Sequence, residues 1–270
     1  MSAPEHDEAL REPAEGRTIL VIDDQQLVAS TLAYSLRDHG LDARYLLVTD
    51  LEAVETAALA HLPGLVLLDL DLGAGPDGEP MDGVDLIVPL RAQGWTVLVI
   101  TGATDLDRIA EAVAHGAANW VVKGANFPEL LRTVVDMTAG RGHLSPGERA
   151  AFIKRYQEVM ATRRKDAERL KTLSPREREV LGRLTEGATA AAIAAETHTS
   201  IRTVQTHIHR ILTKLEVSSQ LAATAIAFRH RSQPPPIRPS VWRKMRGLKR
   251  AADTHSGEGA TAVGRARARW

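Results

Sequence analysis

Five short runs of β-branched and aliphatic residues alternate with stretches of helical periodicity between residues 18 and 139. The alternation predicts strands near residues 18–22, 43–47, 65–68, 97–100 and 120–122. It predicts helices near residues 25–39, 50–60, 84–93, 106–115 and 127–138. Strands that alternate with helices form parallel sheets, because each helix carries the chain back to the edge where the next strand begins. We therefore expect an α/β domain built on a doubly wound, five-stranded parallel sheet.

Polar side chains with complementary chemistry follow four of these strands. In chain order they are Asp23 and Asp24, Asp69, Thr101 and Lys123. The carboxyl ends of parallel strands meet at one edge of the sheet, which is where ligands bind in open α/β folds. Taken singly, an aspartate after a strand is more often a helix cap or a turn residue. Five such groups in one repeating unit instead predict a shared site.

The residue types at this edge fit phosphoryl transfer to a carboxylate. Asp69 follows the uninterrupted run LVLL and is the candidate nucleophile, so its charge and that of the incoming phosphoryl oxygens must be neutralised. Mg²⁺ prefers carboxylate oxygens, which makes Asp23 and Asp24 candidate metal ligands. Lys123 can pair with a phosphoryl oxygen, and the Thr101 hydroxyl can donate a hydrogen bond to it.

The full chain has 270 residues, which is longer than one typical domain. Signals for helix starts indicate where it divides. Capping-box patterns at residues 49–52, 145–148 and 174–177 each predict the start of a helix. The last two lie on either side of a charged stretch that ends near residue 171. We expect a disordered N-terminus (1–16), the α/β domain (17–140), a charged helical linker (141–171), a helical domain (172–230) and a basic, disordered tail (231–270).

The charges are unevenly distributed, although the formal net charge of the chain is zero. Residues 17–140 carry a net charge of −11, whereas residues 141–171 carry +5 and residues 231–270 carry +8. An acidic front half suits a cation site, and a basic back half suits a polyanionic partner.

The absence of cysteine excludes a disulfide scaffold and a thiolate metal site. No apolar run is long enough to cross a membrane, so we expect a soluble, cytoplasmic protein.

A second pattern lies in the helical domain. One apolar stripe at helical spacing is formed by Val204, Ile208, Ile211 and Leu215. The opposite face carries hydrogen-bond donors and no carboxylate: Arg202, Gln205, Thr206 and His209. Such a face suits the major groove of DNA. An alanine-rich helix over residues 189–196, a turn at His198 and a cap at Ser200 precede it. This order fits a helix-turn-helix, although an ordinary three-helix bundle with a polar surface would show the same pattern.

Four segments, VIDDQ, LVLLDLDL, VLVITGATD and AANWVVKGANFPEL, resemble those of the receiver domain of two-component response regulators. The resemblance covers about residues 17–139 and implies a flavodoxin-like fold. It implies that a histidine kinase phosphorylates Asp69. It further implies that Asp23, Asp24, Asp69 and the backbone carbonyl of Asp71 surround Mg²⁺.

The same resemblance implies that Thr101 and Trp120 change position on phosphorylation, with Trp120 at a position where Tyr or Phe is commoner. A departure from the family is the segment LGAGPDGEP, which lies between the phosphoacceptor and the M-D-G turn. We expect an enlarged loop over residues 73–80 that either alters kinase docking or the lifetime of the phosphorylated state, or is an inert insertion. Gly102, where Ala or Ser is commoner, leaves Asp69 more open.

The segments LSPREREVLGRLTEG, IAAETHTSIRTVQTHIHRILTKLEV and SSQLAATAIA resemble the LuxR-type helix-turn-helix domain over about residues 172–227. The resemblance implies that the donor face described above contacts bases. It implies that phosphates are approached by Thr203, His207, Arg210 and Lys214. It also implies that a helix over residues 216–227 pairs two copies. His198 stands where the family often has glycine, so it must enter the left-handed region.

Both resemblances together predict a DNA-binding transcriptional response regulator of the NarL/FixJ type, which is not an enzyme. Its expected partners are a histidine kinase, double-stranded DNA and, on activation, a second copy of itself, with no membrane. One alternative is a DNA-binding regulator whose receiver is no longer phosphorylated. Another is a haloacid-dehalogenase-like phosphatase, because Asp69-Leu70-Asp71 resembles its D-x-D motif. The Asp23–Asp24 pair, the lack of a cap domain and the attached helical domain count against the phosphatase.

Overall fold

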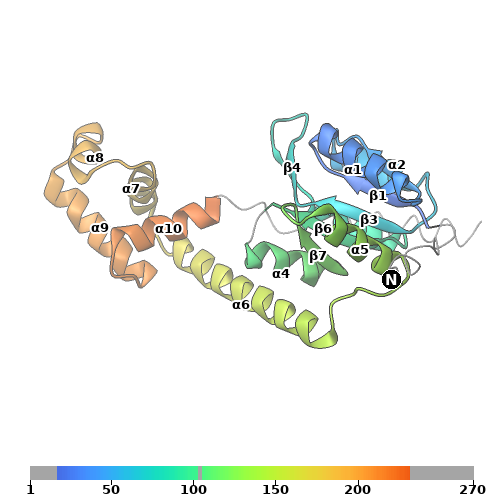
Figure 1. Cartoon of the computed structure of the whole chain (residues 1–270). Coiled ribbons are helices and arrows are strands. Elements are labelled where there is room, and N and C mark those ends of the chain that lie inside the picture. The colour runs from blue at the N-terminus through green and yellow to red at the C-terminus, as the bar shows by residue number, and fades with distance from the viewer. Residues whose placement is uncertain (1–16, 103–104, 232–270) are drawn as a thin grey trace, which may run out of the picture. The chain divides into compact units, whose positions relative to one another are not determined.

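The computed structural model describes residues 17–102 and 105–231, which fold into two compact units (Figure 1). The division between the units falls between Glu168 and Arg169. The segment predicted to be a disordered N-terminus (1–16) and nearly all of the predicted basic tail (232–270) lie outside the described residues. Among the described residues, no helix is both long enough and apolar enough to span a bilayer.

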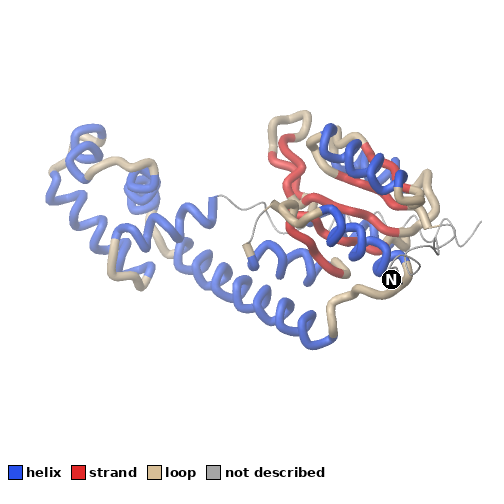
Figure 2. Tube along the Cα trace, in the orientation of Figure 1, coloured by secondary structure: helices blue, strands red, loops and turns tan. Residues whose placement is uncertain are grey.

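Five parallel strands form the sheet of the first unit (Figure 2). They are β1 (Ile19–Ile22), β2 (Ala43–Leu46), β3 (Leu65–Asp69), β6 (Thr96–Thr101) and β7 (Asn119–Val122). Their order is β2-β1-β3-β6-β7, and every neighbouring pair is parallel. The order reverses direction between β1 and β3, and ligands of doubly wound sheets bind at the carboxyl ends of the strands at such a point. The predicted doubly wound sheet is confirmed.

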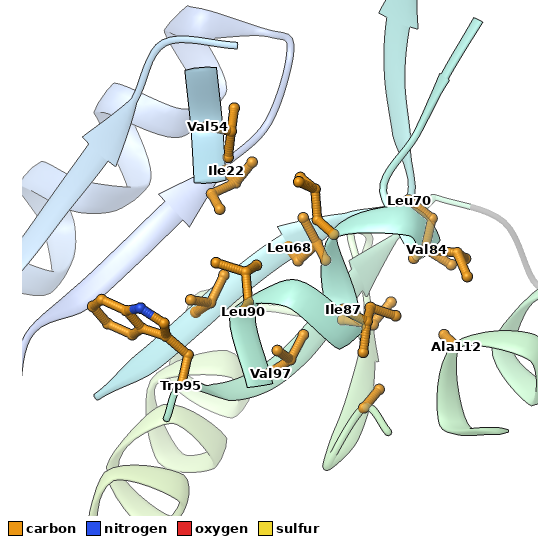
Figure 3. Packing of buried hydrophobic residues seen from close by; sticks show 14 of the residues in the cluster. Ile22, Val54, Leu68, Leu70, Val84, Ile87, Leu90, Trp95, Val97 and Ala112 are labelled. Atoms are coloured by element: carbon orange, nitrogen blue, oxygen red, sulfur yellow. The ribbon is translucent and has the colours of Figure 1, made fainter. Parts of the chain in front are cut away.

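Five helices cover the two faces of this sheet. They are α1 (Gln26–Asp38), α2 (Leu51–Ala58), α3 (Val84–Ala92), α4 (Leu106–His115) and α5 (Phe127–Thr138). Successive strand residues point to opposite faces, so both faces of the central strands β1 and β3 must be apolar. In β1, Ile22 packs with α2 and α3 (Figure 3), and Leu20 belongs to the same cluster, whereas Ile19 and Val21 pack with α1 and α5. The continuous apolar runs in the sequence follow from this double burial.

The capping box predicted at residues 49–52 does not form. Asp50 caps α2 instead, since its Oδ1 accepts a hydrogen bond from the Ala53 N–H at 2.7 Å. The Thr49 hydroxyl donates to the Asp50 carboxylate at 3.3 Å. A carboxylate at a helix N-terminus satisfies a free N–H and also interacts favourably with the helix dipole. The helix therefore begins one residue later than the sequence pattern indicated.

The enlarged loop expected over residues 73–80 is instead part of an antiparallel hairpin, β4 (Asp71–Ala74) and β5 (Pro80–Asp82). Asp71 faces Asp82, and Ala74 faces Pro80 across the pair. Leu72 is fully buried in the core of the first unit. Its partner strand is too short, and the segment too rich in Gly and Pro, for an alternating pattern to be visible in the sequence. Figure 1 shows the hairpin projecting from the five-stranded sheet.

The charged linker forms the helix α6 (Pro146–Lys171), and the capping box predicted at its start is present. The Ser145 N–H donates to Glu148 Oε2 at 2.9 Å, and the Glu148 N–H donates to Ser145 Oγ at 3.3 Å. The first turns of α6 pack on the α/β unit. Arg149 donates to the carbonyls of Ala117 and Ala118, at 2.9 and 3.2 Å.

Two further contacts join α6 to α4. Arg155 Nε lies 2.6 Å from Asp107 Oδ1, at the first turn of α4. At the other end of α4, the ring of Tyr156 meets that of His115 edge to face at a centroid distance of 5.7 Å. The front part of the linker helix is therefore an element of the first unit, rather than a free spacer.

Four helices follow α6 in the described part of the second unit: α7 (Pro175–Thr185), α8 (Ala190–Glu196), α9 (Ile201–Leu215) and α10 (Gln220–Arg231). The predicted capping box at Ser174 and the predicted cap at Ser200 are confirmed, and Thr189 caps α8. The pairing helix expected over residues 216–227 begins later, at Gln220. Glu216 adopts a left-handed conformation, with φ of 55°, and ends α9 there.

Candidate functional site

The carboxyl edge of the sheet brings together the side chains that the sequence predicted to share a site. Asp69 ends β3, Thr101 ends β6, and Lys123 follows β7. The Lys123 ammonium lies 2.6 Å from Asp69 Oδ2 and 2.7 Å from Asp23 Oδ2. The backbone N–H of Lys123 donates a hydrogen bond to the Thr101 carbonyl at 2.8 Å. One ammonium therefore connects the ends of β1, β3 and β7.

Three carboxylates at this edge could hold a metal ion. Asp23, Asp24 and Asp69 each offer an oxygen, and these oxygens lie within 4.8 Å of one another. Asp23 and Asp69 are buried, whereas Asp24 is exposed, so the cluster is reached from the solvent on the Asp24 side. With the Lys123 ammonium, the four groups carry a formal charge of −2, which suits a divalent cation with oxygen ligands. We call these four residues the acidic pocket.

Burial and charge act against each other in this pocket. Burial raises the pKa of Asp69, and the charge of Asp23 raises it further, although the hydrogen bond and charge of Lys123 oppose both. Burial would lower the pKa of Lys123, but its hydrogen bonds and ion pairs with Asp23 and Asp69 outweigh burial and raise it. The pocket therefore holds Lys123 in its charged form, ready to pair with an anion.

The β4–β5 hairpin forms one wall of the pocket. The Asp71 N–H donates a hydrogen bond to the Asp69 carboxylate. Gly73 has φ of 70°, and a Cβ there would lie 2.9 Å from Asp24 Oδ2. Gly83 lies so close to Asp69 that a Cβ would run into its carbonyl oxygen. Glycine at both positions allows the inserted hairpin to lie directly against the acidic residues.

Thr101 and Trp120, the predicted switch residues, have different surroundings. Thr101 is buried at the end of β6. Trp120 lies in β7, is partly buried and packs against the core cluster of the α2–α3 face. A Cβ added to Gly102 would meet no atom within 4 Å.

Sequence reasoning missed Arg108 of α4. Its guanidinium forms a two-bond ion pair with Asp82, at 2.7 and 2.8 Å, and reaches the carbonyl of Leu70 at 3.5 Å. Asp82 belongs to the M-D-G turn that the resemblance singled out, but nothing in the spacing of the two residues along the chain indicates that they pair. Contacts between residues 26 positions apart depend on the packing of α4 against the hairpin, which periodicity does not reveal.

The helix α9 presents the predicted faces. The apolar stripe is fully buried in the core of the second unit. The expected base-facing residues are all exposed: Arg202, Gln205, Thr206 and His209. Thr203 and Arg210 are exposed as well, and His207 is partly buried. His198 enters the left-handed region with φ of 50°, so the turn forms without glycine.

Lys214 was predicted to lie near phosphates together with Thr203, His207 and Arg210, but its ammonium is engaged by groups of the same unit. Its ammonium donates to Glu177 Oε2 at 2.6 Å and to the Thr172 carbonyl at 3.2 Å. Glu177 is buried at the start of α7 and also accepts the Ser174 N–H at 2.7 Å. Burial would raise the pKa of Glu177, but the hydrogen bonds from Lys214 and Ser174 outweigh it and lower the pKa. Lys214 therefore joins α9 to α7.

The outer face of α10 carries large apolar side chains. Leu221 is 80% exposed and Phe228, two helical turns later, is 62% exposed. Residues seven apart lie on the same side of a helix. Exposed apolar residues at this spacing, beside a core that buries Ala223, Ile226 and Ala227, suit contact with another protein surface.

Comparisons with known proteins match two separate segments of the chain. Residues 19–135 match the family model for the response regulator receiver domain, and residues 171–227 match that for bacterial regulatory proteins of the luxR family. The probable transcriptional regulatory protein NarL of Mycobacterium tuberculosis is 33% identical over 177 residues, covering 64% of this chain and 75% of that protein.

Two further proteins align over most of their length. The DNA-binding transcriptional activator DevR/DosR of Mycobacterium tuberculosis is 31% identical over 223 residues, covering 80% of this chain and 97% of that protein. A solved structure of the response regulator RcsB from Salmonella typhimurium is 19% identical and covers 78% of this chain and 97% of its own, with a TM-score of 0.42. The two family models and the two mycobacterial relatives show that this chain belongs to the NarL/FixJ-type response regulators, the DNA-binding transcriptional regulators of two-component systems.

Proposed function

We propose that Asp69 accepts a phosphoryl group from a histidine kinase and that this modification controls how the second unit binds DNA. The observation that supports it most directly is the position of Lys123, whose ammonium lies within ion-pair distance of both Asp69 and Asp23. An anion attached to Asp69 would meet a charged donor that is already in place. A buried aspartate with such a partner has the environment of a functional group rather than that of a helix cap.

The reaction is a transfer between two nucleophiles. The N–P bond of a phosphohistidine donor breaks, a P–O bond to an Asp69 carboxylate oxygen forms, and the electron pair of the broken bond returns to the imidazole nitrogen. The Asp71 N–H and the Lys123 ammonium hold the Asp69 carboxylate in one orientation during this step. Lys123 then neutralises part of the charge on the new phosphoryl group.

The acidic pocket fits a resident Mg²⁺ ion. Asp23, Asp24, Asp69 and the backbone carbonyl of Asp71 would hold it, in keeping with the three clustered carboxylate oxygens and the excess negative charge. When bound, the ion neutralises charge on the phosphoryl oxygens during transfer. Asp23 also accepts the Gln25 N–H at 2.9 Å, so its carboxylate is fixed by the start of α1.

Thr101 and Trp120 would report the modification to the rest of the unit. The Thr101 hydroxyl can donate a hydrogen bond to a phosphoryl oxygen on Asp69, and Trp120 can follow by moving further into the core. Phosphorylation changes the conformation only if the phosphoryl group interacts better with the new arrangement than with the old. The hydrogen bond from Thr101 would supply this preference.

The exposed face of α9 would bind double-stranded DNA. Its charge and donors suit bases in the major groove, with Arg202 and Gln205 nearest the N-terminal end of the helix. Thr203, His207 and Arg210 would lie along phosphates. Lys214 was in the same predicted set, but its ion pair with Glu177 leaves it less available, so we assign it to the packing of the unit instead. The exposed apolar face of α10 would pair two copies.

Labelling with a small phosphodonor tests this proposal. Full-length protein incubated with acetyl phosphate and Mg²⁺ should give a retarded band on a gel that contains a phosphate-binding reagent. Asp69→Asn should abolish that band, because the amide lacks the nucleophilic charge, whereas Asp77→Asn, in the exposed hairpin turn, should leave it unchanged. Chelation of Mg²⁺ should suppress the band in the unmodified protein.

The outcomes of this experiment are distinguishable. Retention of the band in Asp69→Asn would refute the assignment of the phosphoacceptor. Absence of the band in the unmodified protein would favour a regulator that works without phosphorylation. Continuous release of phosphate from an ester substrate would instead favour a phosphatase, for which we expect no activity.

A further inference from the structure

Arg108 has contacts that the proposed phosphoryl transfer does not use. On α4, its guanidinium Nη1 lies 2.8 Å from Asp82 Oδ2, and Nη2 lies 2.7 Å from Asp82 Oδ1. Nη2 also lies 3.5 Å from the Leu70 carbonyl oxygen. A planar guanidinium with two parallel bonds to a carboxylate fixes orientation as well as distance. We call the contacts of Arg108 with Asp82 and Leu70 the Arg108 clamp.

The two anchor points of the Arg108 clamp, the Leu70 carbonyl and the Asp82 carboxylate, belong to residues that flank the Asp69 backbone. Leu70 follows Asp69 directly, and its carbonyl also accepts the Gly83 N–H at 3.0 Å. Asp82 faces Asp71 across the inserted hairpin. Since Gly83 is packed against the Asp69 carbonyl, neither anchor can shift without moving the phosphoacceptor backbone.

The clamp is partly shielded from water. The Arg108 side chain is 31% exposed and that of Asp82 is 16% exposed. Burial works to lower the pKa of Arg108, but the hydrogen bonds and charges of Asp82 and Glu111 outweigh it and raise the pKa further. The guanidinium stays charged at any pH at which the protein folds, and shielded, charge-assisted pairs are stronger than pairs on an open surface.

We propose that the Arg108 clamp is a brake on the switch, which holds α4 in the arrangement in which Lys123 pairs directly with Asp69. Arg108 lies in the first turn of α4 and contacts Leu70 and Asp82, which flank the Asp69 backbone. A rearrangement of the pocket around a phosphoryl group on Asp69 therefore has to break these contacts before α4 can move. The inference rests on the proposed phosphoryl transfer, and it gives the inserted hairpin a role, because β5 positions Asp82.

Loss of the clamp should shift the population toward the switched arrangement. Arg108→Gln removes the charge and one of the two bonds to Asp82 while keeping a polar side chain of similar reach. We expect its initial rate of phosphorylation by acetyl phosphate to rise about five- to tenfold, the change that loss of one charge-assisted pair would produce in a two-state equilibrium. Before phosphorylation, it should also bind operator-containing DNA more tightly by a similar factor.

Matched variants separate a brake from a general loss of structure. Asp82→Asn keeps an oxygen for the Val84 N–H, which Asp82 Oδ1 accepts at 2.9 Å, but removes the charge that faces Arg108. It should accelerate phosphorylation as Arg108→Gln does, and the double variant should gain nothing more. Arg44→Gln breaks a half-exposed ion pair with Asp42 near the amino end of β2 and should leave the rate unchanged.

Each outcome of these measurements either supports or overturns the proposal that the Arg108 clamp is a brake. A folded Arg108→Gln protein that is phosphorylated at the original rate, or more slowly, overturns the brake. Independent, additive effects of Arg108→Gln and Asp82→Asn overturn it as well. If Arg108→Gln does not fold, Arg108→Lys, which keeps the charge but not the parallel bonds, is measured in the same way. Failure of the unmodified protein to be labelled at Asp69 removes the proposed function and this inference together, which is plainly different from labelling at an unchanged rate.

Discussion

The ion pair between Glu177 and Lys214 allows its two charges to be removed one at a time, with unequal consequences. The Glu177 side chain is 4% exposed, whereas that of Lys214 is 37% exposed. Lys214→Gln leaves a buried carboxylate without its cation. Glu177→Gln leaves an ammonium that can turn to water. We therefore expect Lys214→Gln to destabilise the second unit more than Glu177→Gln does.

The expected loss of stability in each variant depends on which charge is left without its partner. Breaking a buried pair so that one charge stays buried costs about 3 to 5 kcal/mol, and the hydrogen bonds from Ser174 to Glu177 reduce this to about 2 to 3 kcal/mol for Lys214→Gln. Glu177→Gln keeps an oxygen for the Ser174 N–H. The Lys214 ammonium that it leaves unpaired is partly exposed, so solvent screens its charge and the cost in stability is small. We expect about 1 kcal/mol for that variant.

Hydrogen exchange of the α9 amides can be measured by mass spectrometry on the full-length protein. It reports the free energy of unfolding of the second unit separately from that of the first. The pKa of Glu177 is lowered from its ordinary value of 4.5, so the charged form contributes stability above pH 4.5. This contribution is lost as the pH falls through the lowered value. The difference in protection between Glu177→Gln and the unmodified protein should thus shrink below pH 4.5. Equal protection in the two variants at neutral pH, or a larger loss in Glu177→Gln, would refute the reasoning from burial.

Two other predictions concern the proposed DNA and dimer surfaces. Arg202→Ala should weaken binding to a specific site by about 1 to 3 kcal/mol in a fluorescence anisotropy titration, and an equal loss on random DNA would contradict base contact by Arg202. Phe228→Ser, which removes an exposed apolar side chain from α10, should lower the fraction of phosphorylated protein that sediments as a dimer and leave the folded monomer intact; an unchanged dimer fraction would exclude this face.

Local sequence signals were sufficient for most of the fold. The sheet and its helices could be predicted because continuous apolar runs and helical periodicity are separated by turn residues throughout the first unit. The β4–β5 hairpin could not be predicted, because its strands are short and two prolines and three glycines lie between its buried residues Leu72 and Met81. The cap of α2 was misplaced by one residue, because Thr49 and Asp50 both fit the preference for an N-cap and only the structure distinguishes them.

The acidic pocket was predictable for a different reason. Parallel strands must end at a common edge, so residues that follow them in the sequence are brought together by topology alone. Asp82 ends β5, which is not part of the parallel sheet, and Arg108 lies in α4, so their pairing depends on how α4 packs against a hairpin that was itself unexpected. The pocket was thus visible in the sequence, whereas the contacts that connect it to α4 were not.

The assignment of Lys214 shows the limit of arguing from one helix at a time. Periodicity places Lys214 on α9 one turn beyond Arg210, so a helix considered alone gives both residues to the exposed face. The carboxylate that engages Lys214 belongs to the capping box of α7, where Glu177 was expected only to satisfy the Ser174 N–H. The same carboxylate also accepts the ammonium because the start of α7 packs against the end of α9. The last turn of α9 therefore takes part, through Lys214, in the packing of the unit.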